Sequence, residues 1–431
     1  MQCHSAKIIL DPSCALEYLR PAFVSDEDNM ADPGSMLLFM PWCKLDKTYN
    51  VGEIELIPFA AGFTQHIAGL GANLHPFVDK IIGMYKTIEG NPIERAAFIR
   101  FADKPPTASL SDDELDLAED HVAIACFAGL SQRQYFGVPN IYCNSDCFLF
   151  HVQRFIDAEF VAFSSHRRAG RITEGGYKPT KVSITVPMNC HAIEEVTLDE
   201  RLLDGLLKQR AAGKDWGRWQ NAISCFNQAN TDGSTVHYQI EWMLLASAYE
   251  HLLAAKSHAK DVACKFTAAL QPAQDVLMKD ASRRSQRMKD DTRPLRFEWI
   301  REFYSVRGDF AHGKLMTQQT ITWNPLEHLV LATIAFPLVA KSLLQQQGRY
   351  ELSDDDRAQI DIFERFADTN EFLCEPPEQK GSNDTHWLRL FGKRHMEVIV
   401  SKGVDEAAQE LREKFPGFLD DEGSNADGSN A

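Results

Sequence analysis

The sequence predicts an α+β protein, with a mixed α/β N-terminal domain over residues 1–197 and an all-α helical bundle over residues 198–370. Two observations favour this fold class. Apolar runs and alternating patterns typical of strands dominate the first half, whereas apolar residues recur at helical spacing from Leu198 onward. With 431 residues in total, each half is long enough to bury a core of its own.

Strand signals open the N-terminal half. Met36–Trp42 is an apolar run and Val51–Phe59 alternates around two glutamates, so we expect these segments to pair across a polar loop. A capping box at Ser111-Asp112-Asp113-Glu114 predicts a helix that continues to about Leu130. Further strands are expected at Ile141–Phe150 and Lys181–Val186, with a loop rich in Arg, Gly and Lys at His166–Lys181.

The C-terminal half predicts a series of helices. They are expected at Leu198–Arg210, Trp216–Gln228, Val236–Lys256, Asp261–Leu270 and Pro325–Leu344, and one more begins near Pro294. The third has the apolar stripe Val236, Ile240, Met243, Leu244, Ala248 and Leu252. The helix after Pro294 has Leu295, Trp299, Ile300, Phe303, Val306 and Phe310 on its apolar side, and Gly313 is placed to end it.

The last segments carry weaker signals. Residues 371–415 form a C-terminal extension, with a strand expected at His395–Val400 and a helix at Val404–Phe415. Residues 416–431 are acidic and rich in Gly, Ser and Asn, which is typical of a disordered tail.

Composition narrows the functional classes. No stretch has the roughly 18 apolar residues of a membrane span, and the N-terminus lacks a secretory signal, so we expect a cytoplasmic protein without membrane partners. The ten cysteines lie in apolar segments, which favours free thiols over disulfides. A net charge of −16 argues against a general nucleic-acid coat protein, although a local basic patch is enough for an RNA substrate.

Arg307 and His312 are the best candidates for chemistry. Metal-free RNA cleavage needs a group that moves the proton of a 2′-hydroxyl and a cation that holds the phosphate. His suits the first role and the planar fork of Arg suits the second. The pattern of an Arg followed by four to six residues and a His carries little weight by itself, because Arg389/His395 fits it as well. Cations near a helix C-terminus also interact favourably with the helix dipole, which is the structural alternative for Arg307 and His312.

The context of Arg307 resembles the ApeA-like HEPN domains. The run from Tyr304 to Gly313 resembles their signature helix: a Tyr, two residues, Arg, a short spacer, then His-Gly. Residues 222–229 look like the leading helix of the family, and residues 242–253 look like its first core helix, in which a Glu, here Glu250, sits just before a Leu pair. Residues 265–270 look like the following helix, and residues 325–344 look like the closing helix. The similarity covers about Leu198 to Thr369.

This resemblance implies a helical bundle that dimerises and places two signature helices across one cleft. Active members are metal-independent ribonucleases used in phage defence or as toxins. Carried over, Arg307 would hold the phosphate and His312 would be the acid/base, with Tyr304, Asp309 and Glu250 as supporting residues. The N-terminal half, which contains no reaction motif, would be a sensor or regulatory domain for an unknown trigger.

Two questions stay open at this point: whether the domain is catalytic, and why Gly308 follows Arg307. HEPN domains also serve as non-catalytic dimerisation and interaction modules. Gly308 departs from the residue after the Arg in active members, which is commonly polar, so either the helix bends there or close packing demands no side chain.

A basic cluster precedes the signature helix. It is expected either to contact the RNA backbone or to be a solvated polar loop. Its members are Arg283, Arg284, Arg287, Lys289, Arg293, Arg296 and Arg301.

Other possible sites are rejected on spacing, and no cofactor is expected. Cys143, Cys147 and His151 lack a fourth zinc ligand and a Cys-x2-Cys knuckle, so buried thiols are favoured over a metal site. Gly69-Leu70-Gly71 lacks the strand and helix of a nucleotide fingerprint, and the chain has no Walker loop and no Gly-x-Ser-x-Gly elbow.

Overall fold

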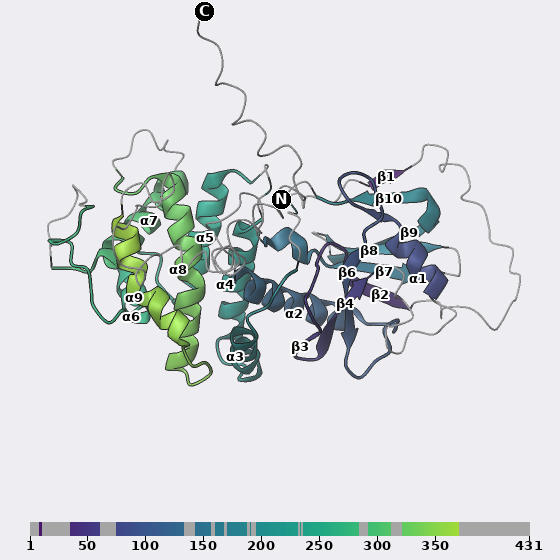
Figure 1. Cartoon of the computed structure of the whole chain (residues 1–431), viewed down its shortest axis with the longest axis horizontal. Coiled ribbons are helices and arrows are strands. Elements are labelled where there is room, and N and C mark those ends of the chain that lie inside the picture. The colour runs from purple at the N-terminus through teal and green to yellow at the C-terminus, as the bar shows by residue number, and fades with distance from the viewer. Residues whose placement is uncertain are drawn as a thin grey trace, which may run out of the picture. The chain divides into compact units, whose positions relative to one another are not determined.

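The computed structural model describes residues 8–10, 35–60, 75–132, 143–156, 160–167, 170–187, 190, 195–231, 233, 236–283, 292–311 and 321–369. All of them belong to one compact unit by their contacts. Figure 1 colours the described elements from the purple N-terminal strands to the green and yellow C-terminal helices. The fold class is confirmed: a sheet-rich N-terminal region precedes a helical C-terminal half.

The larger described sheet is antiparallel, with the strand order β3-β4-β6-β2-β7-β8-β9. Its strands are β2 (Met36–Met40), β3 (Tyr49–Val51), β4 (Ile54–Ala60), β6 (Arg95–Phe101), β7 (His151–Phe155), β8 (Val161–Arg167) and β9 (Gly170–Tyr177). A smaller sheet joins β1 (Ile8–Leu10), β10 (Val182–Thr185) and β5 (Tyr85–Lys86). The helix α1 (His75–Ile82) contributes Val78 and Ile81 to an apolar cluster with residues of both sheets, such as Phe39, Phe98 and Ile184.

Several strand predictions are corrected by this topology. The segments predicted to pair are not neighbours, because β6 lies between β2 and β4 and β3 pairs with β4 instead. The strand expected at Ile141–Phe150 is wrong: Ser145–Phe148 is a 3-10 helix, and the strand β7 begins at His151. The loop expected at His166–Lys181 is largely the β8–β9 hairpin, followed by a second 3-10 helix, Pro179–Lys181. The strand near Lys181–Val186 is confirmed as β10.

The helix α2 (Asp112–Leu130) begins with the predicted capping box and buries Leu115, Ala118, Val122 and Ala125. It also packs against the helical half. The Phe127 ring lies 5.2 Å from Phe226 and 5.6 Å from Phe336, measured between centroids. Helical packing therefore extends across the predicted domain boundary at residue 197.

The helical half contains α3 (Glu200–Ala211), α4 (Trp216–Ala229), α5 (Tyr238–Leu252), α6 (Ala259–Ala269), α7 (Leu295–Ala311), α8 (Pro325–Gln346) and α9 (Asp354–Asp368). Its core is aromatic. Trp242 of α5 stacks on Phe303 of α7 at 5.0 Å, and Phe226 of α4 stacks on Phe336 of α8 at 4.5 Å.

The buried face of α5 differs from the predicted stripe. Ile240 and Met243 are 43% and 38% exposed, whereas Trp242 and Tyr249 are fully buried. Each of these two buried rings also has a polar partner. Trp242 Nε1 donates to the carbonyl of Phe303, and Tyr249 Oη donates to that of Ala332.

The helix α8 is long and apolar enough, by length and composition, to cross a membrane. The expectation that no segment reaches this threshold is therefore wrong. However, 83% of its most apolar window is buried inside the protein, as in the core helix of a soluble protein, so α8 is weak evidence for a membrane span. The predictions for residues 371–415 and 416–431 lie outside the described residues, as does the Gly69-Leu70-Gly71 segment.

Candidate active site

The helix α7 contains Tyr304 and Arg307 of the predicted signature, and the apolar side predicted for this helix is confirmed. Leu295, Trp299, Ile300, Phe303 and Val306 are each at most 2% exposed. Phe310 is partly buried, with its ring 5.4 Å from Trp242 and 6.1 Å from Tyr238. This packing fixes the helix on α5, so the residues beside the apolar stripe face the polar end of α5.

Glu250, Tyr304 and Arg307 form one hydrogen-bonded cluster between α5 and α7. Tyr304 Oη donates to Glu250 Oε2 at 2.6 Å, and Arg307 Nη1 donates to Tyr304 Oη at 2.7 Å. Arg307 Nη1 also lies 3.0 Å from Glu250 Oε2. On the other side of the carboxylate, Ser257 Oγ donates to Glu250 Oε1 at 2.7 Å. The structure thus joins three of the predicted residues, and adds Ser257.

The electrostatics of the cluster favour a charged pair bridged by a neutral phenol. Partial burial alone would raise the pKa of Glu250, but hydrogen bonds from Ser257 and Tyr304 and the Arg307 guanidinium outweigh it and lower that pKa. Burial and the Glu250 carboxylate raise the pKa of Tyr304 to about 12. Tyr304 therefore stays protonated at neutral pH and can donate its hydrogen bond.

Arg307 remains accessible despite these contacts. Its side chain is 30% exposed, and the guanidinium lies over the Tyr304 ring at 5.2 Å from the centroid. A guanidinium has five N–H donors, so the described contacts leave donors for a phosphate. Asp309 is partly buried, and none of the hydrogen bonds or ion pairs described for Arg307 goes to it. His312 lies outside the described residues.

Gly308 sits within a continuous helix, since α7 runs from Leu295 to Ala311. A Cβ built at Gly308 would have no heavy atom within 4 Å, and the residue is exposed. Close packing within the described residues therefore does not require a glycine here.

Two arginines of the predicted RNA-binding cluster are structural instead. Arg283 is 7% exposed and bidentate to Glu327, at 2.7 Å and 2.6 Å. Arg296 is 4% exposed and pairs with Glu364 at 2.9 Å and Asp275 at 2.7 Å. A buried guanidinium already held by carboxylates cannot reach an RNA phosphate, which corrects the prediction for both. Arg284, Arg287 and Lys289 lie outside the described residues.

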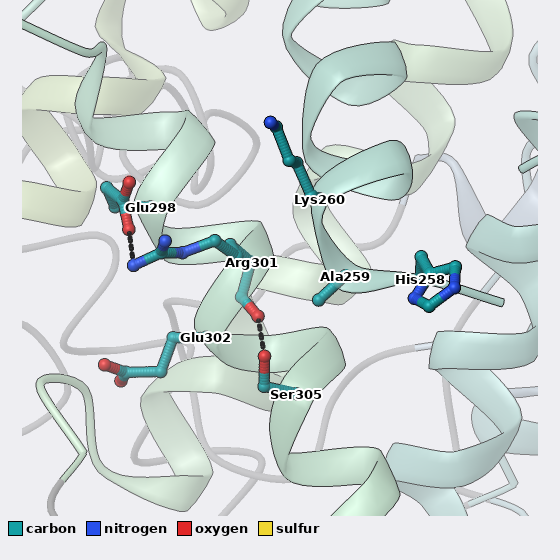
Figure 2. A pocket seen from close by; sticks show the side chains of 7 residues that line it. All are labelled: His258, Ala259, Lys260, Glu298, Arg301, Glu302 and Ser305. Atoms are coloured by element: carbon teal, nitrogen blue, oxygen red, sulfur yellow. Dashed lines mark hydrogen bonds and ion pairs between the residues drawn. The ribbon is translucent and has the colours of Figure 1, made fainter. Parts of the chain in front are cut away.

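The other two described members, Arg293 and Arg301, are about one-third exposed. Both lie near the buried Glu298 carboxylate, at 3.7 Å and 2.5 Å respectively. Arg301 lines a pocket of about 320 Å³ between α7 and the start of α6. Figure 2 shows this pocket: residues 258–260 lie opposite Glu298, Arg301, Glu302 and Ser305 of α7.

Sequence reasoning missed Ser257, His258 and Lys260. They belong to the turn and first residues of α6, and no periodic signal marks them. Their only sequence cue is position, a short polar stretch directly after the helix that contains Glu250.

The seven cysteines among the described residues are free thiols, as predicted. Cys43, Cys126 and Cys147 are buried, and the Sγ atoms of Cys147 and Cys190 are 3.8 Å apart, too far for a disulfide. Among the residues that the structure describes, no group of three or more His, Cys, Asp or Glu side chains is arranged to hold a metal ion. His151 instead contacts Tyr85, with Nδ1 at 3.2 Å from the phenol oxygen.

Comparison with protein-family models, curated proteins and solved structures gives no match for this chain.

Proposed function

We propose that the protein is a metal-independent HEPN-type endoribonuclease that cuts RNA through its 2′-hydroxyl, with Arg307 and His312 as catalytic residues. The observation that supports the proposal best is the Glu250–Tyr304–Arg307 cluster. It holds an arginine by a carboxylate while 30% of the arginine side chain stays exposed. A fixed guanidinium with unused donors is suited to a phosphate that gains charge during reaction.

The proposed reaction is an internal transfer at one phosphate. His312 takes the proton of the 2′-hydroxyl, the 2′-oxygen forms a bond to phosphorus, and the bond from phosphorus to the 5′-oxygen breaks. The leaving 5′-oxygen receives a proton, and the products are a 2′,3′-cyclic phosphate and a 5′-hydroxyl. Arg307 stabilises the charge on the phosphate oxygens, while Glu250 and Tyr304 orient Arg307.

The proposal includes a homodimer, because the composite cleft needs two signature helices and symmetry supplies the second. In this proposal the enzyme acts in the cytoplasm in phage defence or as a toxin, and a trigger at the sheet-rich N-terminal region shifts it toward the active state.

A non-catalytic interaction module is the alternative, and one observation favours it. Arg307 already has a carboxylate partner in Glu250, and an ion pair of this kind also serves to join two helices. Under that alternative the domain dimerises and binds partners, but RNA stays intact.

Incubation of the purified full-length protein with RNA separates the two functions. The proposal predicts cleavage that persists in EDTA, products ending in a 2′,3′-cyclic phosphate, and no cleavage of DNA of the same sequence, which lacks the 2′-hydroxyl. Light scattering on the same sample should give a dimer. A trigger only shifts the population toward the active state, so the untriggered protein should still cut some RNA. Intact RNA under all conditions, with a folded dimer, would favour the interaction module instead.

A further inference from the structure

Building on the proposed function, we propose that the pocket between α6 and α7 binds a second phosphodiester of the RNA, next to the one that is cut, through Lys260 and Arg301. The pocket measures about 320 Å³. That is at the small end of ligand-binding pockets, and large enough for one sugar-phosphate unit.

The pocket adjoins the Arg307 cluster through one shared turn. Ser257, which donates to Glu250 in that cluster, directly precedes His258, which lines the pocket. On α7 the same relation holds, because Tyr304 belongs to the cluster and Ser305 lines the pocket. Arg301 and Arg307 are separated by about 9 Å along the helix axis at 1.5 Å per residue, and by about 120° around it at 3.6 residues per turn. An RNA strand that follows the surface of α7 around the helix can therefore contact both places.

Both carboxylates of the pocket have partners, and one partner of Glu298 is Arg301 of the pocket itself. Glu298 is 3% exposed and is paired with Arg301 and Arg293. Glu302 accepts hydrogen bonds from the backbone N–H and the hydroxyl of Thr322, at 2.7 Å and 2.8 Å, and lies 3.1 Å from His328 Nε2. In Figure 2 the Glu302 carboxylate lies on the side away from Lys260 and His258.

The cationic side chains of the pocket can still bind an anion. Lys260 is exposed, and no ion pair joins its ammonium to another residue of the described chain. Arg301 is 34% exposed and pairs with Glu298 through one end of its guanidinium, so other N–H groups remain to donate. His258, also exposed, begins α6 without a side-chain cap, and the first turn of that helix adds positive partial charge.

The lining selects a phosphate rather than a base. Apart from the His258 imidazole, the residues that line the pocket offer no aromatic ring on which a base could stack. Contacts from Lys and Arg to phosphate oxygens fix the register of a nucleic acid without reading its sequence. We therefore expect the pocket to position the strand, with no preference for the base it carries.

Binding of a fluorescent single-stranded RNA with 2′-O-methyl groups throughout tests the proposal, because this RNA has no nucleophile and stays uncut. Affinity would be measured by fluorescence anisotropy at several salt concentrations, with wild type, Lys260→Ala and Lys260→Glu. The matched control is Lys214→Glu, an exposed lysine in the turn between α3 and α4. Lys260 supports no described contact, so these variants should fold normally.

The proposal predicts that Lys260→Ala weakens binding roughly two- to fivefold, as for one exposed ion pair, and that Lys260→Glu weakens it further. The slope of log K against log salt should fall by about 0.7 in Lys260→Ala, the value for one phosphate on a single strand. Lys214→Glu should change the affinity less than Lys260→Glu. If Lys260→Ala binds with wild-type affinity and a wild-type salt slope, and the wild-type protein cuts ordinary RNA, the pocket proposal is overturned while the proposed function stands. A wild type that neither binds nor cuts RNA would overturn the proposed function with it.

Discussion

Arg307 Nη1 of α7 lies 3.0 Å from Glu250 Oε2 of α5, so this ion pair joins the two helices. Tyr304 bridges the same two groups, and Ser257 supports the carboxylate from the turn before α6. The pair makes Glu250 a positioning residue in the proposed mechanism, because it fixes the guanidinium without needing to touch the substrate.

Glu250→Gln should lower the rate of RNA cleavage roughly tenfold or more, with a smaller change in KM. The amide can still accept a hydrogen bond but loses the charge that holds the guanidinium, and hydrogen bonds to charged groups contribute roughly 1.5–3 kcal/mol. Single-turnover rates would measure the loss, with the exposed Glu351→Gln as control. A merely structural role is excluded by a double-mutant cycle: Glu250→Gln should cost little more once Arg307 is Ala. Fully additive losses would contradict the positioning role.

Arg283→Ala should destabilise the fold by roughly 3–5 kcal/mol, because it leaves the Glu327 carboxylate buried without its partner. Urea unfolding would measure this, and Lys208→Ala is the control, because its pair with Asp204 is more than half exposed and should contribute about 1 kcal/mol or less. Equal, small losses in the two variants would contradict the structural role assigned to Arg283.

Gly308→Ala should raise the free energy of unfolding by about 1 kcal/mol, since alanine is that much better than glycine inside a helix and the new methyl group meets no neighbour within the described part of the chain. Thermal unfolding checks the sign. A lower Tm would contradict an unconstrained helical position at Gly308.

Stability should fall with acid between about pH 6.5 and about pH 4, in part because of His151. Burial lowers the pKa of His151 to about 4, so the unfolded chain takes up a proton before the folded one does. The stabilising effect of a neutral His151 is complete above pH 6.5 and is lost as the pH falls toward 4. Urea midpoints of wild type and His151→Gln, compared across this range, should converge toward low pH. A constant difference between them would contradict the shifted pKa.

Local sequence patterns predicted the structure correctly where a single local interaction or periodicity determines it. The Ser111 capping box appears as expected, with Glu114 N donating to Ser111 Oγ and Ser111 N donating to Glu114 Oε2. The apolar side of α7 was predictable because Leu295, Trp299, Ile300, Phe303 and Val306 recur at helical spacing, although Arg296 and Glu298 between them are buried as well.

Prediction failed where a helix has two apolar faces, and where the partner of a side chain lies far away in the sequence. In α5 both sides are apolar, so the predicted stripe was right for Ala248 and Leu252 but wrong for Ile240 and Met243, which are exposed. The buried rings on the true face are those of Trp242 and Tyr249, whose hydrogen bonds go to distant parts of the chain. Arg283 is buried together with its partner Glu327, which lies far away in the sequence, so no local pattern predicts the pair. The contact of Ser257 with Glu250 has the same origin.

The most direct test of the proposed chemistry is the cleavage rate of His312→Ala, measured beside wild type on one RNA substrate in EDTA. Circular dichroism and thermal unfolding would first establish that the variant is folded. The proposed mechanism predicts a rate lower by a factor on the order of 10²–10⁴, the usual contribution of a positioned acid/base. It also predicts a substantial loss in Arg307→Lys, whose ammonium lacks the planar fork. A folded His312→Ala protein that cleaves RNA at the wild-type rate would contradict the assignment.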